Sequence, residues 1–430
     1  MSDTIIDGIR RGQSWVLEGS VDVFEASLRQ IVTEGVSPHP KIVIADPYLI
    51  LDCNIPSTPE DMDMLQKDGF LEAETNDKFT PSEHVFDSHY HRTVGCLARN
   101  GKITISPGGT GGNIAVNLSR LAGESGADIL FLGAVPDGDP AVYKRLHDAL
   151  DSANITEVEN ITGRHLSPAI SLVFSLEKRK VILKKPVQDI HEWLNPQILA
   201  LASVQKAFRE ADLVLTTLNM RDVASGLVDG IFKERWERGA MSALTLPTDR
   251  KCAIHNAGLI DWYSASCNIL LGNETEAKNV FGDRPLPEIF ERISHNFREG
   301  VLATHCHGLR DPVALITLGK EGACLVTPAG WKHYPAILNP LIVNPAGAGD
   351  SCFAAFLRAY VGGLSLNDCV GGGQSLGWAV LGINQTHYVD PLAGIALSNP
   401  ELAKRYARIG KSLEFPYRPA EAQPSAACVL

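Results

Sequence analysis

The sequence Asn-Pro-Ala-Gly-Ala-Gly-Asp at residues 344–350 runs directly into the apolar segment Ser-Cys-Phe-Ala-Ala-Phe-Leu at residues 351–357. The apolar segment predicts a helix that ends at the glycine pair 362–363. Small residues let the backbone approach a ligand closely, and the unpaired N–H groups of a helix N-terminus hold anionic oxygens. An acid in the first turn can simply cap the helix, which explains Asp350 but not the small residues before it. We therefore predict an anion-binding turn, with Asp350 beside it where a general base for an attacking hydroxyl would lie.

A second glycine-rich turn, Gly-Gly-Thr-Gly-Gly-Asn at residues 108–113, opens a helix that begins near Ile114. Such a loop can wrap a ligand, and the side chain of Asn113 offers both a donor and an acceptor to hydroxyl groups. A glycine-rich turn into a helix is weak evidence by itself. This turn has neither the dinucleotide-binding spacing nor the Lys-Ser/Thr ending of a Walker loop.

Short apolar runs suited to buried strands alternate with helical patterns from Lys41 onward. The runs occupy residues 42–44, 129–132, 213–215, 269–271 and 314–316. This alternation predicts right-handed βαβ units and a mostly parallel sheet covered by helices on both faces. Two stretches break the pattern: residues 53–107 are polar and loop-rich, and residues 167–184 alternate like a two-sided strand pair. They predict a small sheet that covers a site as a lid.

Composition excludes several classes of protein. The chain has 430 residues and a formal net charge of −11, which argues against general binding to nucleic acid phosphates. Its nine cysteines include no CxxC pair and predict reduced thiols rather than a disulfide scaffold or zinc ribbon. No signal peptide is recognised, and the uncharged stretch 369–389 contains polar residues and glycines that predict a buried helix. We expect a cytoplasmic protein without a membrane partner.

Together these segments resemble the ribokinase-like (PfkB) family of carbohydrate and nucleoside kinases. Residues 344–350 are similar to the C-terminal signature of that family, DTxGAGD, and residues 108–113 to its N-terminal signature, GGxGxN. Three shorter matches follow in the expected order, at residues 132–137, 273–276 and 316–322. The matches span residues 41 to about 390, which is most of the chain.

The resemblance implies an α/β fold, a ribokinase-like three-layer sandwich with a mostly parallel sheet and a small β lid. It also implies ATP-dependent, Mg²⁺-assisted phosphorylation of a hydroxyl on a sugar or nucleoside. Asp350 would deprotonate the acceptor, and the N–H groups of Gly347, Ala348 and Gly349 would hold the transferring phosphoryl group. The residues expected to bind the nucleotide are Asn273, Glu276, Thr317, Gly319, Gly322 and Gln374, with Glu276 holding Mg²⁺ through water.

The acceptor site implied by the resemblance contains Gly108, Gly109, Gly112, Asn113 and a carboxylate near the first strand. The alignment puts Ile50 at the position of this carboxylate. Asp52 lies two residues on and shares the same strand face, so a shifted register would let Asp52 serve. A second departure is Asn344-Pro345 in place of the usual Asp-Thr, which removes an N–H and a hydroxyl. The strings at residues 45–47, 215–217 and 244–246 and the long lid insertion look more like nucleoside kinases than small sugar kinases.

The chain is expected to divide into three parts: an N-terminal helical extension (residues 1–40), a kinase domain (41–415) and a C-terminal tail (416–430). Parts of 46–107 and 165–186 would supply the lid. Its exposed strands would be edges that a homodimer could cover. A different class of function is a catalytically weak or inactive scaffold, which Asn344-Pro345 favours and the intact Gly-Ala-Gly-Asp opposes. A dinucleotide-dependent oxidoreductase is disfavoured, because its fingerprint loop is missing.

Overall fold

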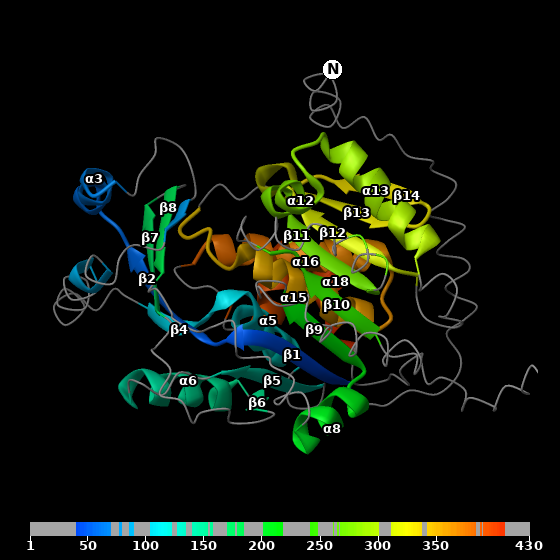
Figure 1. The fold of residues 1–430 in the computed structure, drawn as a ribbon, viewed down its shortest axis with the longest axis horizontal. Helices are drawn as coiled ribbons and strands as arrows, with labels where there is room; N and C mark the ends of the chain where they lie inside the picture. Colours follow the sequence, from blue (N-terminus) through cyan, green and yellow to red (C-terminus); the bar gives the residue numbers. More distant parts are fainter. Residues whose placement is uncertain are drawn as a thin grey trace, which may run out of the picture.

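The computed structural model describes the parts of the chain that carry the predicted strands and motifs (Figure 1). These are residues 40–69, 77–79, 86–89, 104–122, 127–134, 140–153, 155–157, 170–176, 179–184, 201–217, 241–247, 261, 265, 267–300, 311–337, 342–383, 388 and 390–408. The expected N-terminal helix before residue 40 and the tail at 416–430 lie outside the described residues. The division into those parts stays a prediction.

A nine-stranded sheet forms the centre of the fold, in the order β14-β13-β12-β11-β10-β9-β1-β5-β6. Its strands are β1 (Lys41–Tyr48), β5 (Asp128–Ala134), β6 (Ile155–Glu157), β9 (Leu213–Thr217), β10 (Met241–Thr245), β11 (Ile269–Asn273), β12 (Val313–Thr317), β13 (Ala323–Thr327) and β14 (Gly330–Tyr334). Neighbours from β12 to β6 pair in parallel, whereas β13 and β14 are antiparallel. Each apolar run singled out in the sequence lies in one of the parallel strands, so the prediction of a mostly parallel sheet is confirmed.

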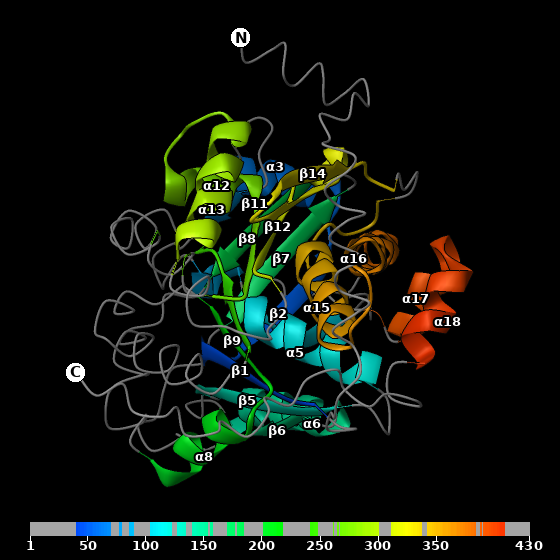
Figure 2. The ribbon, with the colours of Figure 1, turned by 90° about the vertical axis from the view of Figure 1, so that its right-hand side faces the viewer.

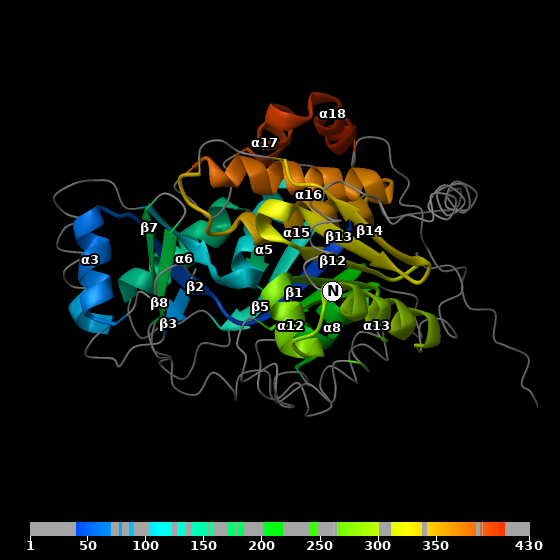
Figure 3. The same ribbon diagram turned by 90° about the horizontal axis from the view of Figure 1, so that it is seen from above.

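Helices cover both faces of this sheet, because alternate strand residues point into two different cores. Ile42 and Ile44 of β1 belong to one buried cluster, and Val43 and Ala45 belong to the other. The first cluster includes α5 (Gly109–Ala122), α6 (Pro140–Ser152), α15 (Ala348–Val361), α16 (Leu366–Leu381), α17 (Pro391–Ser398) and α18 (Pro400–Arg408). The second includes α8 (Ala202–Glu210), α12 (Glu274–Phe281) and α13 (Leu286–Glu299). Figure 3 shows α15 and α16 on one side of the sheet and α12 and α13 on the other, which is the predicted three-layer arrangement.

The predicted second sheet is present and stands beside the first (Figure 1). Its order is β3-β8-β7-β2-β4, with β2 (Ile50–Pro56), β3 (Asp77–Phe79), β4 (Thr104–Gly108), β7 (Ile170–Leu176) and β8 (Arg179–Lys184). On one side of β2, Leu51, Cys53 and Ile55 belong to the same buried cluster as residues of α3 (Pro59–Lys67). Only Leu49 separates β1 from β2, and β4 runs directly into α5. The small sheet is thus joined to the body at the glycine-rich turn; a homodimer through it stays a prediction.

Glycines bring α16 close to its neighbours. A Cβ added at Gly373 would lie 2.8 Å from the carbonyl oxygen of Cys352, and one at Gly377 would lie 2.9 Å from that of Ala348. Residues 369–381, part of the stretch predicted as a buried helix, lie in α16. Outside α16 lie α17 and α18, as Figure 2 shows. Among the residues that the structure describes, none of the helices has the length and apolar character that crossing a membrane requires.

Replacing Gly372 with alanine is expected to loosen the contact between α16 and α18. The added methyl group would overlap the hydroxyl of Tyr406, which is buried and donates to the carbonyl oxygen of Ala355 at 2.9 Å. We expect a loss of about 1–3 kcal/mol in the free energy of unfolding, measured in urea. Gly371→Ala is the matched control: its Cβ would lie 3.3 Å from the flexible end of Leu402, and alanine favours a helix over glycine by about 1 kcal/mol. Equal effects of the two substitutions would contradict this account.

Candidate active site

One face of the central sheet becomes polar at the carboxyl ends of its strands. On the face that supports α5 and α15, the strands β1, β9 and β10 carry the core residues Ile44, Leu215 and Ala243. Two residues further along each strand, on the same face, the residues are Asp46, Thr217 and Thr245, all buried. Open parallel sheets bind ligands at this edge, because the strand ends and the following loops surround a crevice there.

Asp46 holds the start of α5 against this edge. One carboxylate oxygen accepts the backbone N–H of Gly111 at 2.7 Å, and the other accepts the hydroxyl of Thr217 at 2.9 Å. A carboxylate suits this position, since the first N–H groups of a helix have no partner within the helix. Asp46 was not predicted as a functional residue. Its position two residues after the first apolar run, near the carboxyl end of β1, was the available signal.

The glycines of the turn at residues 108–113 make room for two carboxylates. A Cβ added at Gly108 would overlap the carboxyl group of Asp52, and one at Gly111 would overlap that of Asp46. Gly109 has a φ of 74°, a left-handed conformation that favours glycine. Close packing against Asp46 and Asp52 therefore accounts for two of the four glycines in this turn.

Ile50 and Asp52 of β2 lie against different glycines of this turn. Asp52 lies against Gly108, whereas an added Cβ at Gly109 would meet the apolar end of Ile50 at 3.1 Å. Asp52 is buried and is the register partner of Ser106 on β4. Asp52 therefore lies beside the glycine-rich turn, as Asp46 does, and its role toward an acceptor stays a prediction. A Cβ added at Gly112 would lie 2.8 Å from Cδ1 of Leu49, so Gly112 packs closely on this leucine.

Asn113 and Asp350 meet between the two glycine-rich turns. The Nδ2 of Asn113 donates to Oδ2 of Asp350 at 2.8 Å, although the two residues are 237 positions apart in the sequence. Asn113 is 3% exposed, and its Oδ1 has no hydrogen-bond partner within the described part of the structure. A buried acceptor of this kind costs free energy unless a donor reaches it. A ligand hydroxyl is a donor of the right kind.

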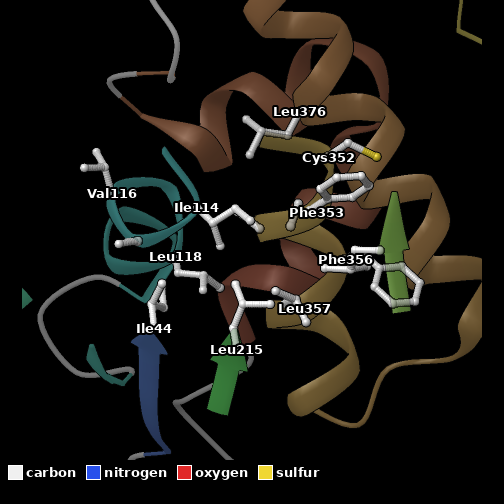
Figure 4. Packing of buried hydrophobic residues seen from close by; sticks show 14 of the residues in the cluster. Ile44, Ile114, Val116, Leu118, Leu215, Cys352, Phe353, Phe356, Leu357 and Leu376 are labelled. Carbon is white, nitrogen blue, oxygen red and sulfur yellow. The ribbon is translucent and has the colours of Figure 1, made fainter. Parts of the chain in front are cut away.

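A second asparagine fixes how α5 lies on α15. Asn117, one helical turn after Asn113, donates from Nδ2 to the hydroxyl of Ser351 at 3.1 Å and to the carbonyl oxygen of Asn113 at 2.9 Å. Apolar side chains continue the contact, and Figure 4 shows Ile114 of α5 pointing toward Phe353 of α15. The position of Asp350 relative to α5 is therefore set by two consecutive polar contacts and by the apolar packing between α5 and α15.

The turn before α15 has the geometry expected of an anion-binding turn. Gly347 is the N-cap residue with a φ of 77°, and it has no side chain that could occupy the helix N-terminus. A Cβ added at Gly349 would meet no atom within 4 Å, so there is open space beside the first turn. Asp350 is half-buried in that turn. The first turn of α15 therefore combines N–H groups that have no partner within the helix, open space beside Gly349 and the carboxylate of Asp350.

Asn273 and Thr317 are direct register partners at the carboxyl ends of β11 and β12. Asn273 and Glu276 form a reciprocal helix cap: Oδ1 of Asn273 accepts the N–H of Glu276 at 2.9 Å, and Oε2 of Glu276 accepts the N–H of Asn273 at 3.0 Å. Local helix capping thus accounts for this motif. The carboxylate of Glu276 is buried and is of the chemistry that can hold Mg²⁺ through water; that role stays a prediction.

Gly319 and Gly322, two of the remaining residues predicted to bind the nucleotide, lie in the turn between β12 and β13. Gly319 has a φ of 58° and open space around an added Cβ, whereas Gly322, with a φ of 101°, lies tightly against the backbone at the end of β14. Gln374 supports the same region, since its Nε2 donates to the carbonyl oxygens of Tyr334 and Pro335 at 3.1 and 3.2 Å. Gln374 therefore braces the backbone that Gly322 packs on. Its role toward a nucleotide stays a prediction.

Cys352 lies two residues after Asp350 but is expected to be inert. Burial raises the pKa of its thiol to about 12, because the thiolate is poorly solvated there. The thiol stays protonated at neutral and mildly alkaline pH. Iodoacetamide at about pH 8 should leave Cys352 unmodified in the folded protein and modify it after denaturation, as read by peptide mass spectrometry. Rapid native alkylation of Cys352 would contradict the burial of this thiol.

Comparison with known proteins gives consistent matches. The family described as "pfkB family carbohydrate kinase" matches residues 83–388. A relative named ribokinase, from Schizosaccharomyces pombe, is 22% identical over 263 residues, which are 61% of this chain and 76% of that protein. The solved structure of a probable sugar kinase from Rhizobium etli CFN 42 has a TM-score of 0.62 and 19% identity, covering 84% of this chain and 99% of that one. The solved structure of adenosine kinase from Schistosoma mansoni in complex with 2-fluoroadenosine has a TM-score of 0.63 and 14% identity. The match covers 82% of this chain and 98% of that one.

Proposed function

Since the chain belongs to the pfkB family of carbohydrate kinases, we propose that it transfers the terminal phosphoryl group of ATP to a hydroxyl of a nucleoside or a sugar. The family and the ribokinase-like fold predicted from the sequence are both confirmed. The residues that carry out the reaction and the acceptor itself are part of the proposal.

The contact between Asn113 and Asp350 at the open start of α15 is the observation that supports this function most directly. It brings a carboxylate that can accept a proton next to N–H groups that can hold a phosphoryl group. Phosphoryl transfer needs positioning and neutralisation of spread negative charge more than it needs covalent chemistry. Two glycine-rich turns that are remote in sequence form this arrangement together.

In the proposed reaction, Asp350 accepts the proton of the acceptor hydroxyl as its oxygen attacks the terminal phosphorus of ATP. The new O–P bond forms while the bond to the β-phosphate oxygen breaks, and ADP leaves. The N–H groups of Gly347, Ala348 and Gly349 bind the phosphoryl oxygens, and the dipole of α15 favours their charge. Asn113 orients Asp350 through Nδ2 and offers Oδ1 to an acceptor hydroxyl.

Two further sets of residues complete the proposed site. Asp52, beside Gly108, Gly109 and Gly112, binds acceptor hydroxyls, and its charge makes these hydrogen bonds strong. The nucleotide side would be formed by Asn273, Glu276, Thr317, Gly319, Gly322 and Gln374, and Glu276 would hold Mg²⁺ through water. When bound, Mg²⁺ neutralises charge on the phosphates.

The alternative of an inactive scaffold rests on Asn344-Pro345. Asn344 still orders the turn, because its Oδ1 accepts the N–H of Ala346 at 2.9 Å. The turn before Gly347 is therefore anchored despite the missing hydroxyl, which supports an active site over a scaffold.

A kinase assay tests the proposal. The purified chain is incubated with Mg·ATP and, separately, adenosine, inosine, guanosine, ribose and fructose, with ADP release measured by a coupled assay and the phosphorylated product by mass spectrometry. We expect acceptor-dependent ADP release with at least one of these compounds. A folded chain that releases no ADP above the acceptor-free rate with any of them, and does not bind Mg·ATP by calorimetry, would overturn the proposed function.

A further inference from the structure

A buried amide pair connects the small sheet to the turn that precedes α15. The Nδ2 of Asn344 donates to Oδ1 of Asn54 at 3.2 Å, and both side chains are fully buried. Asn54 lies on β2 and Asn344 opens the Asn-Pro-Ala-Gly-Ala-Gly-Asp sequence. The two residues are 290 positions apart, so the contact depends on how the small sheet is placed on the body.

The hydrogen bonds continue on both sides of this pair. Oδ1 of Asn344 accepts the N–H of Ala346 at 2.9 Å, in the turn just before Gly347. The Nδ2 of Asn54 donates to the hydroxyl of Ser106 on β4 at 3.4 Å. A continuous series of buried polar groups therefore runs from two strands of the small sheet to the backbone that begins the anion-binding turn.

An apolar contact joins the same two parts independently. Val173 of β7 and Ile182 of β8 form a small buried cluster with Ala346, separate from the two large cores. Asn54, Val173 and Ile182 are register partners across the small sheet, so they form one row on the face that meets the turn. Ala346 is thus held from the small sheet by packing and, through Asn344, by hydrogen bonds.

The strand β2 carries a second relevant residue on that face. Asp52 lies two residues before Asn54, so the two side chains point to the same side of the strand. Asp52 lies against Gly108 of the glycine-rich turn. A shift of β2 would therefore move the proposed acceptor carboxylate and the contact to the anion-binding turn together.

We propose that Asn54 and Asn344 are positioning residues that couple the placement of the small sheet to the geometry of the anion-binding turn. Binding of the acceptor against β2 then strengthens binding of the nucleotide phosphates, and the nucleotide strengthens acceptor binding by the same factor. This inference rests on the proposed function for its two ligands. The coupling itself is a property of the chain without ligands.

The chemistry of the pair suggests a specific set of variants. Each member is an amide, which can donate and accept. When one of the two positions carries an aspartate, the asparagine at the other position can rotate its amide and still donate a hydrogen bond to the new carboxylate. Two aspartates leave no donor between residues 54 and 344 and place two buried carboxylates against each other. The double variant Asn54→Asp/Asn344→Asp should therefore break a contact that each single variant keeps.

The test measures the affinity of the Mg²⁺ complex of AMP-PNP, a non-hydrolysable ATP analogue, by calorimetry for the wild type, both single variants and the double variant. We expect each single variant to stay within about 2-fold of the wild type and the double variant to lose about 20-fold or more, well beyond the product of the single losses. Asn268→Asp is the control for an added buried carboxylate, since Asn268 lies just before β11 and accepts the N–H of Ser242. It should bind like the wild type. Additive losses, with the double variant equal to the product of the single ones, would overturn the proposal.

Amide hydrogen exchange gives a readout that needs no ligand. The N–H of Ala346 should exchange about 10-fold faster in the double variant than in either single variant. If the double variant does not fold, Val173→Ala removes the apolar contact without adding charge and should also speed exchange at Ala346; unchanged exchange in that variant would contradict the coupling. If the wild type fails to bind the AMP-PNP complex, the proposed function is overturned. If the variants still show the expected differences in exchange at Ala346, the coupling between the small sheet and the turn stands without it.

Discussion

Asp350→Asn is expected to lower kcat by about 10²–10⁴-fold with the best acceptor, because the amide cannot accept the hydroxyl proton. The variant should fold, since an asparagine at 350 can still accept the hydrogen bond that Asn113 donates at 2.8 Å. The Michaelis constants for Mg·ATP and acceptor should change little, because the substitution keeps size and hydrogen bonding. Steady-state kinetics with the coupled ADP assay measures all three values.

Asp368→Asn is the matched control for this substitution. Asp368 occupies the same position in the first turn of α16 that Asp350 occupies in α15, and it pairs with Arg405 at 2.7 Å. Its replacement should leave kcat within about 2-fold, since a partly exposed ion pair contributes little. A fall of similar size in both variants would show that loss of a helix-start carboxylate, rather than loss of a base, explains the result.

Asp52→Asn is expected to raise the Michaelis constant of the acceptor by about 10–100-fold, because hydrogen bonds to a charged partner contribute about 1.5–3 kcal/mol. The Michaelis constant of Mg·ATP should change much less. The substitution keeps the shape that Gly108 packs against, so the glycine-rich turn should remain in place. Initial rates over a matrix of acceptor and ATP concentrations separate the two constants.

Asp63→Asn serves as the control, because Asp63 is an exposed carboxylate on α3 beside the same small sheet. It should leave both constants unchanged. An Asp52→Asn variant with normal kinetics for every acceptor would remove Asp52 from the proposed acceptor site. The carboxylate predicted from the family pattern would then have to be supplied by another residue, and Asp46, which accepts the N–H of Gly111 in the same turn, is a candidate.

The central sheet could be predicted from the sequence because parallel strands are buried on both faces. The runs at residues 213–215 and 269–271 are apolar throughout for this reason, and they lie in β9 and β11. The hairpin of β13 and β14 was not predicted. Every residue of β14 is half-buried, which leaves no continuous apolar run in the sequence.

The candidate site was predictable as parts but not as an assembly. The two glycine-rich turns indicated Asn113 and Asp350 separately, yet the hydrogen bond between them depends on how α5 lies on α15. The same holds for Asn54 and Asn344, which no local pattern connects. The cap formed by Asn273 and Glu276 is different: a spacing of three residues before a helix is a local signal, and it could have been recognised from the sequence.

A crystal structure with Mg·ADP, aluminium fluoride and the acceptor that gives the highest rate tests the central claim most directly. We expect the fluoride group at the N–H groups of Gly347, Ala348 and Gly349, with the acceptor hydroxyl oxygen within about 3 Å of a carboxylate oxygen of Asp350. Binding of the fluoride group at any other part of the chain, or an acceptor hydroxyl out of reach of Asp350, would contradict it.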